Sequence, residues 1–246
     1  MLGKILSRKS KKTDGTNSVA SYPVDIPSRV IEIFEEVQPF TMTSIERVNA
    51  LVDSVDYIVD HQIPGDIVEC GVWRGGSMMV VAKCLAASQQ FRTIHLYDTF
   101  EGMSEPTKED KDYSGGTAVQ QLDADPTKSG NIWAYSPIEE VKNNLTSVNY
   151  PNEQLHFIKG KVEETIPGTI PDQISLLRLD TDWYESTYHE LVHLFPRLVP
   201  GGVLIIDDYG HWQGAKKAVD QYFEEQKLKL FLSRIDYTGR LCIKLA

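Results

Sequence analysis

The sequence predicts an α/β fold in which helices cover both faces of a mostly parallel sheet. From Pro64 onward, short apolar runs alternate with helical patterns through five strand–helix units, and such alternation builds parallel strands. A glycine-rich turn follows the first strand, and carboxylates follow the fourth and fifth. Doubly wound sheets bind ligands at these carboxyl ends of their strands. The 246 residues suffice for one large domain.

Two helices are predicted ahead of the sheet. Apolar residues recur at helical spacing over 29–37, and Pro39 ends this first helix. The second helix is predicted over 44–60, with one apolar face that runs from Ile45 to Ile58.

The remaining elements follow in regular alternation. Strands are predicted at 66–70, 93–97, 155–158, 174–179 and 203–206, and helices at 78–87, 136–148, 186–198 and 213–226. The helix over 136–148 begins with the Ser-x-x-Glu pattern of a capping box, from Ser136 to Glu139. The chain ends with segments 230–235 and 241–245 around a Tyr-Thr-Gly turn. This pattern predicts a terminal hairpin that adds an antiparallel strand to the sheet.

These patterns divide the chain into a tail at 1–26, the N-terminal helices at 27–63 and an α/β domain at 64–246. The first twelve residues hold five Lys and Arg residues and no acid, which predicts a disordered basic tail. A weak contact of this tail with a membrane surface is the alternative. No stretch is long enough to span a membrane, so no stable membrane anchor is expected. The polar stretch 101–130 has little periodicity, and it is a candidate lid together with helix 29–37.

Composition and charge narrow the function classes. Hydrophobic residues make up 41% of the chain and charged residues 24%, as in ordinary globular proteins. The formal net charge of −10 repels phosphate backbones, so nucleic acid is not an expected partner. Cys70, Cys84 and Cys242 are odd in number and form no close pair, which indicates buried thiols and a reducing, cytoplasmic compartment. The apolar N-terminal helices leave a homodimer possible.

The glycine-rich turn indicates a particular ligand. It reads Glu69-Cys-Gly71-Val-Trp-Arg-Gly75-Gly76, which differs from the Gly-x-Gly-x-x-Gly of dinucleotide folds and lacks the Lys-Ser/Thr of a phosphate loop. Glu69 suits a cationic amino group, and Asp98 at the end of the second strand suits a ribose diol. Together they point to an amino-acid nucleoside such as S-adenosylmethionine, although a purely structural glycine turn would look similar.

Four carboxylates predict a metal site. Asp180 and Asp182 follow the fourth strand, and Asp207 and Asp208 follow the fifth. Carboxylates that converge over one crevice repel each other unless a positive charge lies between them. Oxygen ligands favour a hard cation, with Mg²⁺ ahead of Mn²⁺ or Ca²⁺. Asp180 and Asp182 can share a face while Thr181 points away, so one acid could bind the metal and the other act as a base. The alternative is that these acids cap the helices that follow.

At this point the chain resembles the macrocin O-methyltransferase family, whose members methylate sugar hydroxyls of antibiotics. The resemblance covers most of the chain, from about 40 to 244. Its motifs are the glycine turn within 63–76, the Leu-Tyr-Asp-Thr-Phe-Glu-Gly-Met run at 96–103, the Leu-Asp-Thr-Asp-Trp-Tyr-Glu-Ser run within 177–187 and the Ile-Asp-Asp-Tyr-Gly-His run within 202–212.

This resemblance implies a class I, Rossmann-like methyltransferase fold with a seven-stranded sheet and N-terminal lid helices. It also implies a Mg²⁺ or Mn²⁺ ion that binds neighbouring sugar hydroxyls of a glycosylated natural product. Carried over residue by residue, Asp182 is the general base. The metal ligands are Asp180, Asp207 and Asp208. The residues expected to contact S-adenosylmethionine are Thr41, Met42, Thr43, Glu69, Gly71, Ser77, Asp98 and Trp183.

One motif departs from the family, and several alternatives stay open. The chain has Gly160-Lys161-Val162 where Gly-Asp is expected near the adenine. Because a lysine cannot accept a hydrogen bond from the adenine amine, stacking by Trp183 is a possible substitute. His211 is a rival to Asp182 as the base. A catechol-type aromatic O-methyltransferase and a non-catalytic S-adenosylmethionine-binding scaffold are the other candidate functions.

Overall fold

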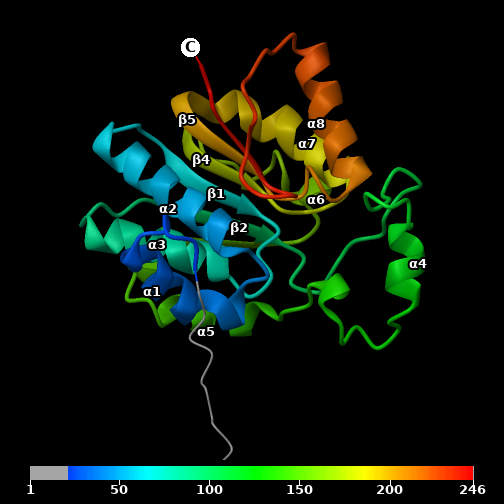
Figure 1. Ribbon diagram of the computed structural model, residues 1–246, viewed down its shortest axis with the longest axis horizontal. Helices are drawn as coiled ribbons and strands as arrows, with labels where there is room; N and C mark the ends of the chain where they lie inside the picture. The colour runs from blue at the N-terminus through cyan, green and yellow to red at the C-terminus, as the bar shows by residue number, and fades with distance from the viewer. Residues whose placement is uncertain (1–21, 246) are drawn as a thin grey trace, which may run out of the picture.

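The computed structural model describes residues 22–245 and forms one seven-stranded sheet, in the order β3-β2-β1-β4-β5-β7-β6 (Figure 1). The parallel strands are β1 (Asp66–Cys70), β2 (Ile94–Asp98), β3 (Leu155–Lys159), β4 (Ile174–Leu179) and β5 (Leu198–Ile206). β7 (Arg240–Ile243) pairs antiparallel with β5, and β6 (Ser233–Arg234) pairs antiparallel with β7. The predicted mostly parallel sheet with a terminal hairpin is therefore confirmed. The strand order reverses between β1 and β4, where doubly wound sheets bind their ligands.

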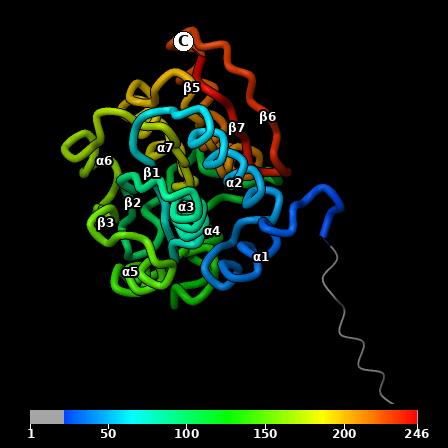
Figure 2. The backbone as a smooth tube through the Cα atoms, turned by 90° about the vertical axis from the view of Figure 1, so that its left-hand side faces the viewer, coloured from blue at the N-terminus to red at the C-terminus, as the bar shows by residue number. Residues whose placement is uncertain are grey.

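Helices cover both faces of this sheet (Figure 1). One face carries α1 (Ser28–Val37), α2 (Ile45–Asp60), α3 (Gly76–Ala87) and α5 (Ile138–Thr146), and the other carries α6 (Val162–Thr165), α7 (Tyr184–Leu194) and α8 (Gln213–Glu225). Short 3₁₀ turns occupy Gln38–Phe40, Asn131–Trp133, Asn152–Gln154 and Phe195–Arg197. Figure 2 shows the sheet running from β3 at one edge to β7 and β6 at the other. None of the helices within 22–245 is long and apolar enough to cross a membrane.

Two predicted helix boundaries were wrong for identifiable reasons. The helix predicted over 186–198 ends at Leu194, because Pro196 cannot donate a backbone hydrogen bond and β5 already begins at Leu198. The capping box does not form, because Pro137 occupies the N-cap position and Ser136 lies one residue before it. By contrast, Ser44 caps α2, since its side chain accepts a 3.2 Å hydrogen bond from the Arg47 amide.

The N-terminal helices share a core with the sheet. Apolar residues of α1 and α2 pack with those of α3, β1 and β2 in one continuous cluster. The sequence pattern therefore changes at residue 63, but the hydrophobic core continues across this position. Residues 1–21 of the predicted tail lie outside the described residues. Tyr22 and Ile26, which the sequence assigned to that tail, pack against the core, and the Tyr22 ring contacts Phe34 edge-on.

The polar stretch 101–130 packs on a separate, small hydrophobic cluster. It contains the helix α4 (Ala118–Asp123), which stands beside the carboxyl edge of the sheet in Figure 1. Apolar residues of this segment pack around the buried rings of Trp183 and Trp212. Buried Asp110 joins the segment to α7, because its carboxylate accepts a 2.8 Å hydrogen bond from the Tyr184 amide. The segment is thus a packed part of the wall of the site.

Candidate active site at the carboxyl edge of the sheet

The glycine turn brings the end of β1 against the end of β4. Gly71 has a φ of +82°, and a Cβ at this position would lie 2.0 Å from the carbonyl oxygen of Asp180. Only glycine fits such an approach without displacement of the backbone. At the start of α3, a Cβ on Gly76 would lie 2.5 Å from the carbonyl oxygen of Phe40. The segment at 40–43 therefore rests on the glycine turn.

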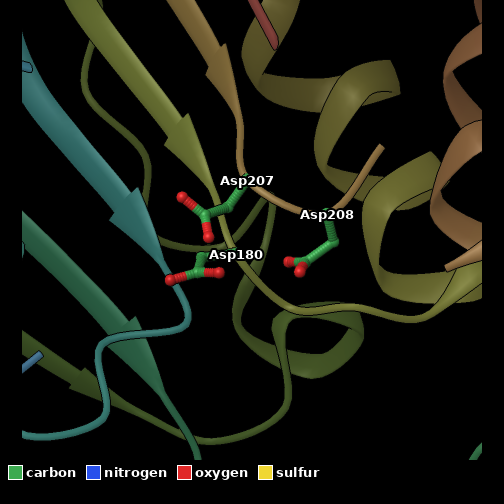
Figure 3. Close-up of side chains that lie close together, drawn as sticks. All are labelled: Asp180, Asp207 and Asp208. Atoms are coloured by element: carbon green, nitrogen blue, oxygen red, sulfur yellow. The ribbon is translucent and has the colours of Figure 1, made fainter. Parts of the chain in front are cut away.

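The three predicted metal ligands lie together. Asp180 follows β4, and Asp207 and Asp208 follow β5, so neighbouring parallel strands deliver them to one edge (Figure 3). One carboxylate oxygen from each lies within 4.8 Å of the other two. Asp207 is buried, whereas Asp180 and Asp208 are partly exposed. Such a spacing allows all three to bind one ion.

Two arginines that were not predicted lie behind these acids. Arg178 of β4 is buried and donates hydrogen bonds of 2.8 Å to Glu69, 2.6 Å to Asp180 and 2.5 Å to Asp207. Arg47 of α2 also donates to Asp207, and its Nε lies 3.1 Å from a carboxylate oxygen of Asp236. The signal for Arg178 was present in the sequence, because a charged residue within the apolar run of a buried strand requires partners. Nothing local in the sequence indicated Arg47.

The charges and donors of this cluster fit a divalent cation. Two guanidinium groups lie within a cluster of six carboxyl groups, so negative charge is in excess when all are ionised. The six belong to Glu69, Asp180, Asp182, Asp207, Asp208 and Asp236. The loss of water around their carboxyl groups, together with the charges of neighbouring acids, raises the pKa of both Asp180 and Asp208 well above the usual range. Within residues 22–245, no backbone amide or cationic group donates a hydrogen bond to the buried Oδ2 of Asp208, and its carboxyl group lies beside those of Asp180 and Asp182. A hard cation would satisfy this oxygen and offset the excess charge.

Asp182, the predicted base, has an unusual conformation. Its φ of +68° is left-handed, a conformation that non-glycine residues adopt mainly where the surrounding structure enforces it. Burial raises its pKa to about 7, and the charges of Asp180 and Asp207 add to the effect. Between the two acids, the Thr181 hydroxyl donates a 2.9 Å hydrogen bond to buried Glu190 of α7. A carboxyl group with a pKa near neutrality suits proton transfer.

Two cavities meet beside Asp180 and Asp182. Gly71, Tyr97, Asp98, Thr99, Gly160, Lys161 and Glu163 are among the residues that line the β2-side cavity. Thr41, Thr43, Arg47, Ser77, Asp207, Asp208, His211 and Tyr237 are among those that line the β5-side cavity. Both cavities share Met42, Trp73, Ala134, Asp180 and Asp182. The arrangement can therefore hold two ligands whose ends meet beside Asp182.

The predicted cofactor residues fall into different places. Asp98 lines the β2-side cavity, and its carboxylate also accepts hydrogen bonds of 2.7 Å from the Val72 amide and 2.6 Å from the Phe100 amide. Thr41, Thr43 and Ser77 line the β5-side cavity instead. Glu69 is buried behind the turn against Arg178, and burial raises its pKa to about 8.

Trp183 lies away from both cavities. Its ring is buried and packs edge-on against Trp212 with centroids 4.9 Å apart, while its Nε1 donates to the carbonyl of Ser104. The Trp183 side chain has this direction because α7 begins at the next residue and directs the indole into the core beneath α4. Trp183 is therefore not placed to stack on an adenine in this structure. Trp73, which was not predicted, lines both cavities with a left-handed φ of +47°.

Comparisons with known proteins show the family of the chain. A family model described as macrocin O-methyltransferase matches residues 5–243. Demethyldecarbamoylnovobiocin O-methyltransferase from Streptomyces niveus is 32% identical over 200 residues, which cover 81% of this chain and 73% of that protein. A 4′-O-methyltransferase of a rhamnosyl tetracenomycin C from Streptomyces olivaceus is 34% identical over 202 residues, with coverages of 81% and 73%.

A solved structure is similar over the same region. The O-methyltransferase NovP matches with a TM-score of 0.73 and 31% identity, over 84% of this chain and 83% of NovP. Both the sequence matches and the fold therefore support the same assignment. The chain belongs to the macrocin O-methyltransferase family and is an S-adenosylmethionine-dependent O-methyltransferase.

Proposed function

We propose that this enzyme methylates a hydroxyl of a sugar unit on a glycosylated natural product, with the help of Mg²⁺ or Mn²⁺ held by Asp180, Asp207 and Asp208. The observation that carries the proposal is the meeting of two cavities beside these acids and Asp182. A relative that acts on a rhamnosyl tetracenomycin supports a sugar as the acceptor. S-adenosylmethionine would supply the methyl group, and the metal ion would lower the pKa of the acceptor hydroxyl.

The residues of the chain divide the work between binding and proton transfer. Asp98 lines the β2-side cavity, where its carboxylate can accept hydrogen bonds from a ribose diol. Asp182 lies where the cavities join, so its carboxylate can take the proton of the acceptor hydroxyl. Arg178 holds Asp180 and Asp207 from behind and fixes their direction. Such positioning of two reactants supplies a large part of the rate acceleration.

Asp182→Asn tests the assignment of the base. Asparagine has nearly the same shape and tolerates left-handed φ, so the fold and the affinity for S-adenosylmethionine should stay unchanged. We expect kcat to fall about 100- to 10,000-fold, the usual contribution of a general base. The matched variant is His211→Ala, since His211 also lines the β5-side cavity. A large loss in His211→Ala with near-normal turnover in Asp182→Asn would reverse the assignment.

Metal dependence and the acceptor class need separate measurements. We expect EDTA to stop methyl transfer and Mg²⁺ or Mn²⁺ to restore it. Full turnover in the presence of the chelator would refute the metal role while leaving the methyltransferase assignment intact. A screen of glycosides against catechols, read out as release of S-adenosylhomocysteine, tests the sugar. Preferential methylation of catechols would replace the sugar by an aromatic diol.

A further inference from the structure

We propose that Tyr113, His211 and Tyr237 form an acceptor subsite that binds a flat, uncharged ring face next to the reacting hydroxyl. The three rings, which we call the aromatic rim, come from three separate parts of the chain. The inference rests on the proposed function, because it extends the acceptor site beyond the carboxylates.

The aromatic rim continues the wall of the β5-side cavity. His211 and Tyr237 both line that cavity together with Asp182 and Asp208. The Tyr113 ring lies just beyond them, with its centroid 5.6 Å from that of His211 and 6.3 Å from that of Tyr237. All three contacts within the rim are edge-to-face, so each covers one face of one ring and the remaining faces can receive a ligand.

Two of the three rings are exposed although they gather at one place, and His211 is half-buried. Tyr113 is 70% exposed and Tyr237 is 54% exposed. Exposed apolar side chains that stand singly are normal, whereas a cluster at the mouth of a cavity marks a binding surface. The polar contacts of the rim are also modest: the Tyr237 hydroxyl and Nδ1 of His211 are 3.2 Å apart. The rim therefore offers mainly ring faces.

The backbone holds the rim in position. The segment before Tyr113 is bridged to Trp212 through Asp112, whose carbonyl also accepts a 2.8 Å hydrogen bond from the Gln213 side chain. On the other side, the turn after β5 packs tightly on the hairpin, since a Cβ on Gly210 would overlap the carbonyl oxygen of Tyr237. A subsite that is rigid before binding loses little entropy when the ligand arrives.

Charge in this cavity selects against phosphorylated acceptors. Of the described residues that line it, Arg47 is the single Lys or Arg, and Asp207 and Asp236 already pair with it. A nucleotide sugar would place its diphosphate near several carboxylates, where the charge of the proposed metal ion is already offset by the three aspartates that would hold it. This distribution of charge favours the uncharged glycoside of the proposed function over a nucleotide sugar as the acceptor.

Tyr113→Ala tests the subsite, with Tyr113→Phe as the conservative variant. Phe91→Ala is the matched control, because Phe91 is 50% exposed but precedes β2 at the amino ends of the strands, opposite the site. For an aryl glycoside we expect Tyr113→Ala to raise KM about 2- to 12-fold, the range of one aromatic contact. The values of kcat and of KM for S-adenosylmethionine should stay unchanged, as should all parameters of the other two variants.

Two further acceptors separate the possible sources of the ring face. If the methyl glycoside of the same sugar keeps its KM in Tyr113→Ala, the aglycone stacks on the rim; if its KM rises equally, the sugar itself does. An unchanged KM for both glycosides, or an equal loss in Tyr113→Phe, would overturn the subsite. A nucleotide sugar that is methylated more efficiently than the aryl glycoside would overturn the argument from charge.

Failure of the proposed function would be recognised independently. If none of these acceptors is methylated, calorimetry of the aryl glycoside in the presence of S-adenosylhomocysteine replaces the kinetic assay. Weaker binding to Tyr113→Ala than to the natural protein and Phe91→Ala would still support the aromatic rim. Equal binding to all three would refute it.

Discussion

Gly71→Ala should displace the end of β4 from the end of β1 within the site while leaving most of the fold in place. Gly71 joins β1 to α3 and touches the backbone of Asp180 after β4. The added methyl group therefore acts on the close approach of two strand ends at the switch in strand order. The substitution changes no charge and no hydrogen-bonding side chain, and the added methyl group also faces the β2-side cavity that Gly71 lines.

The expected magnitude follows from two contributions. Left-handed backbone costs an alanine about 1–2 kcal/mol, of which reduced freedom of the unfolded chain returns about 0.4–1 kcal/mol. In addition, the Cβ would lie 2.0 Å from the Asp180 carbonyl oxygen, so the β4 end must move by about 1 Å to reach an ordinary contact. Overpacking of this kind costs about 1–3 kcal/mol. The sum is a loss of about 1–5 kcal/mol of unfolding free energy. Because a 1 Å shift of catalytic groups costs about 100-fold in rate, we expect kcat to fall by about that factor.

Gly115→Ala is the matched control for this experiment. Gly115 also has a left-handed φ, +96°, but an added Cβ would have no atom within 4 Å. Urea denaturation should therefore show a loss of no more than about 2 kcal/mol in this variant, with normal kcat and normal affinity for S-adenosylmethionine. If Gly71→Ala lost no more stability and activity than Gly115→Ala, the close approach to Asp180 would not matter for the site.

Two further variants test the buried charges. Arg178→Met leaves buried acids without their partner, so we expect urea denaturation to show a loss of about 3–5 kcal/mol of unfolding free energy. The control Arg29→Met breaks only a surface ion pair and should cost less than about 1 kcal/mol. Equal losses in the two variants would refute the role of Arg178. Burial raises the pKa of Glu190 well above 4.5, so the folded state retains a proton that the unfolded state releases, and stability should fall as pH rises above about 4.5. Glu190→Gln should remove this part of the pH dependence above pH 4.5, whereas a change at exposed Glu224 should not. An unaltered slope in Glu190→Gln would contradict the assignment.

The sequence predicted those parts of the site that depend on local pattern and sheet topology. Asp180, Asp207 and Asp208 each follow an apolar strand, and the carboxyl ends of neighbouring parallel strands meet at one edge. Their convergence therefore required no knowledge of side-chain packing. Gly71 was predictable on the same grounds, because a tight turn at the end of the first strand requires its backbone freedom.

Contacts between distant segments were not predictable in this way. Arg47 reaches Asp207 across 160 positions of the sequence, and no local pattern in α2 distinguishes it from a solvent-exposed arginine. Trp183 shows the opposite error, since its place beside Asp182 in the motif suggested a ligand contact. The direction of its side chain depends instead on where α7 begins and on the core beneath α4.

The arginines also change the electrostatic argument for the metal. Repulsion among strand-end acids alone would have implied a cation, yet Arg178 and Arg47 already supply positive charge between some of them. Their hydrogen bonds engage both oxygens of Asp207 and one of Asp180, whereas they leave Asp208 free. The case for a cation therefore rests on the oxygen that the arginines do not reach and on the remaining excess of acids. Because Arg47 also binds the hairpin through Asp236, the same ion pairs that orient the acids tie α2 and β6–β7 to the site. A change in charge at Asp207 would thus disturb the contact of α2 and the hairpin with the β5-side cavity as well as the proposed metal site.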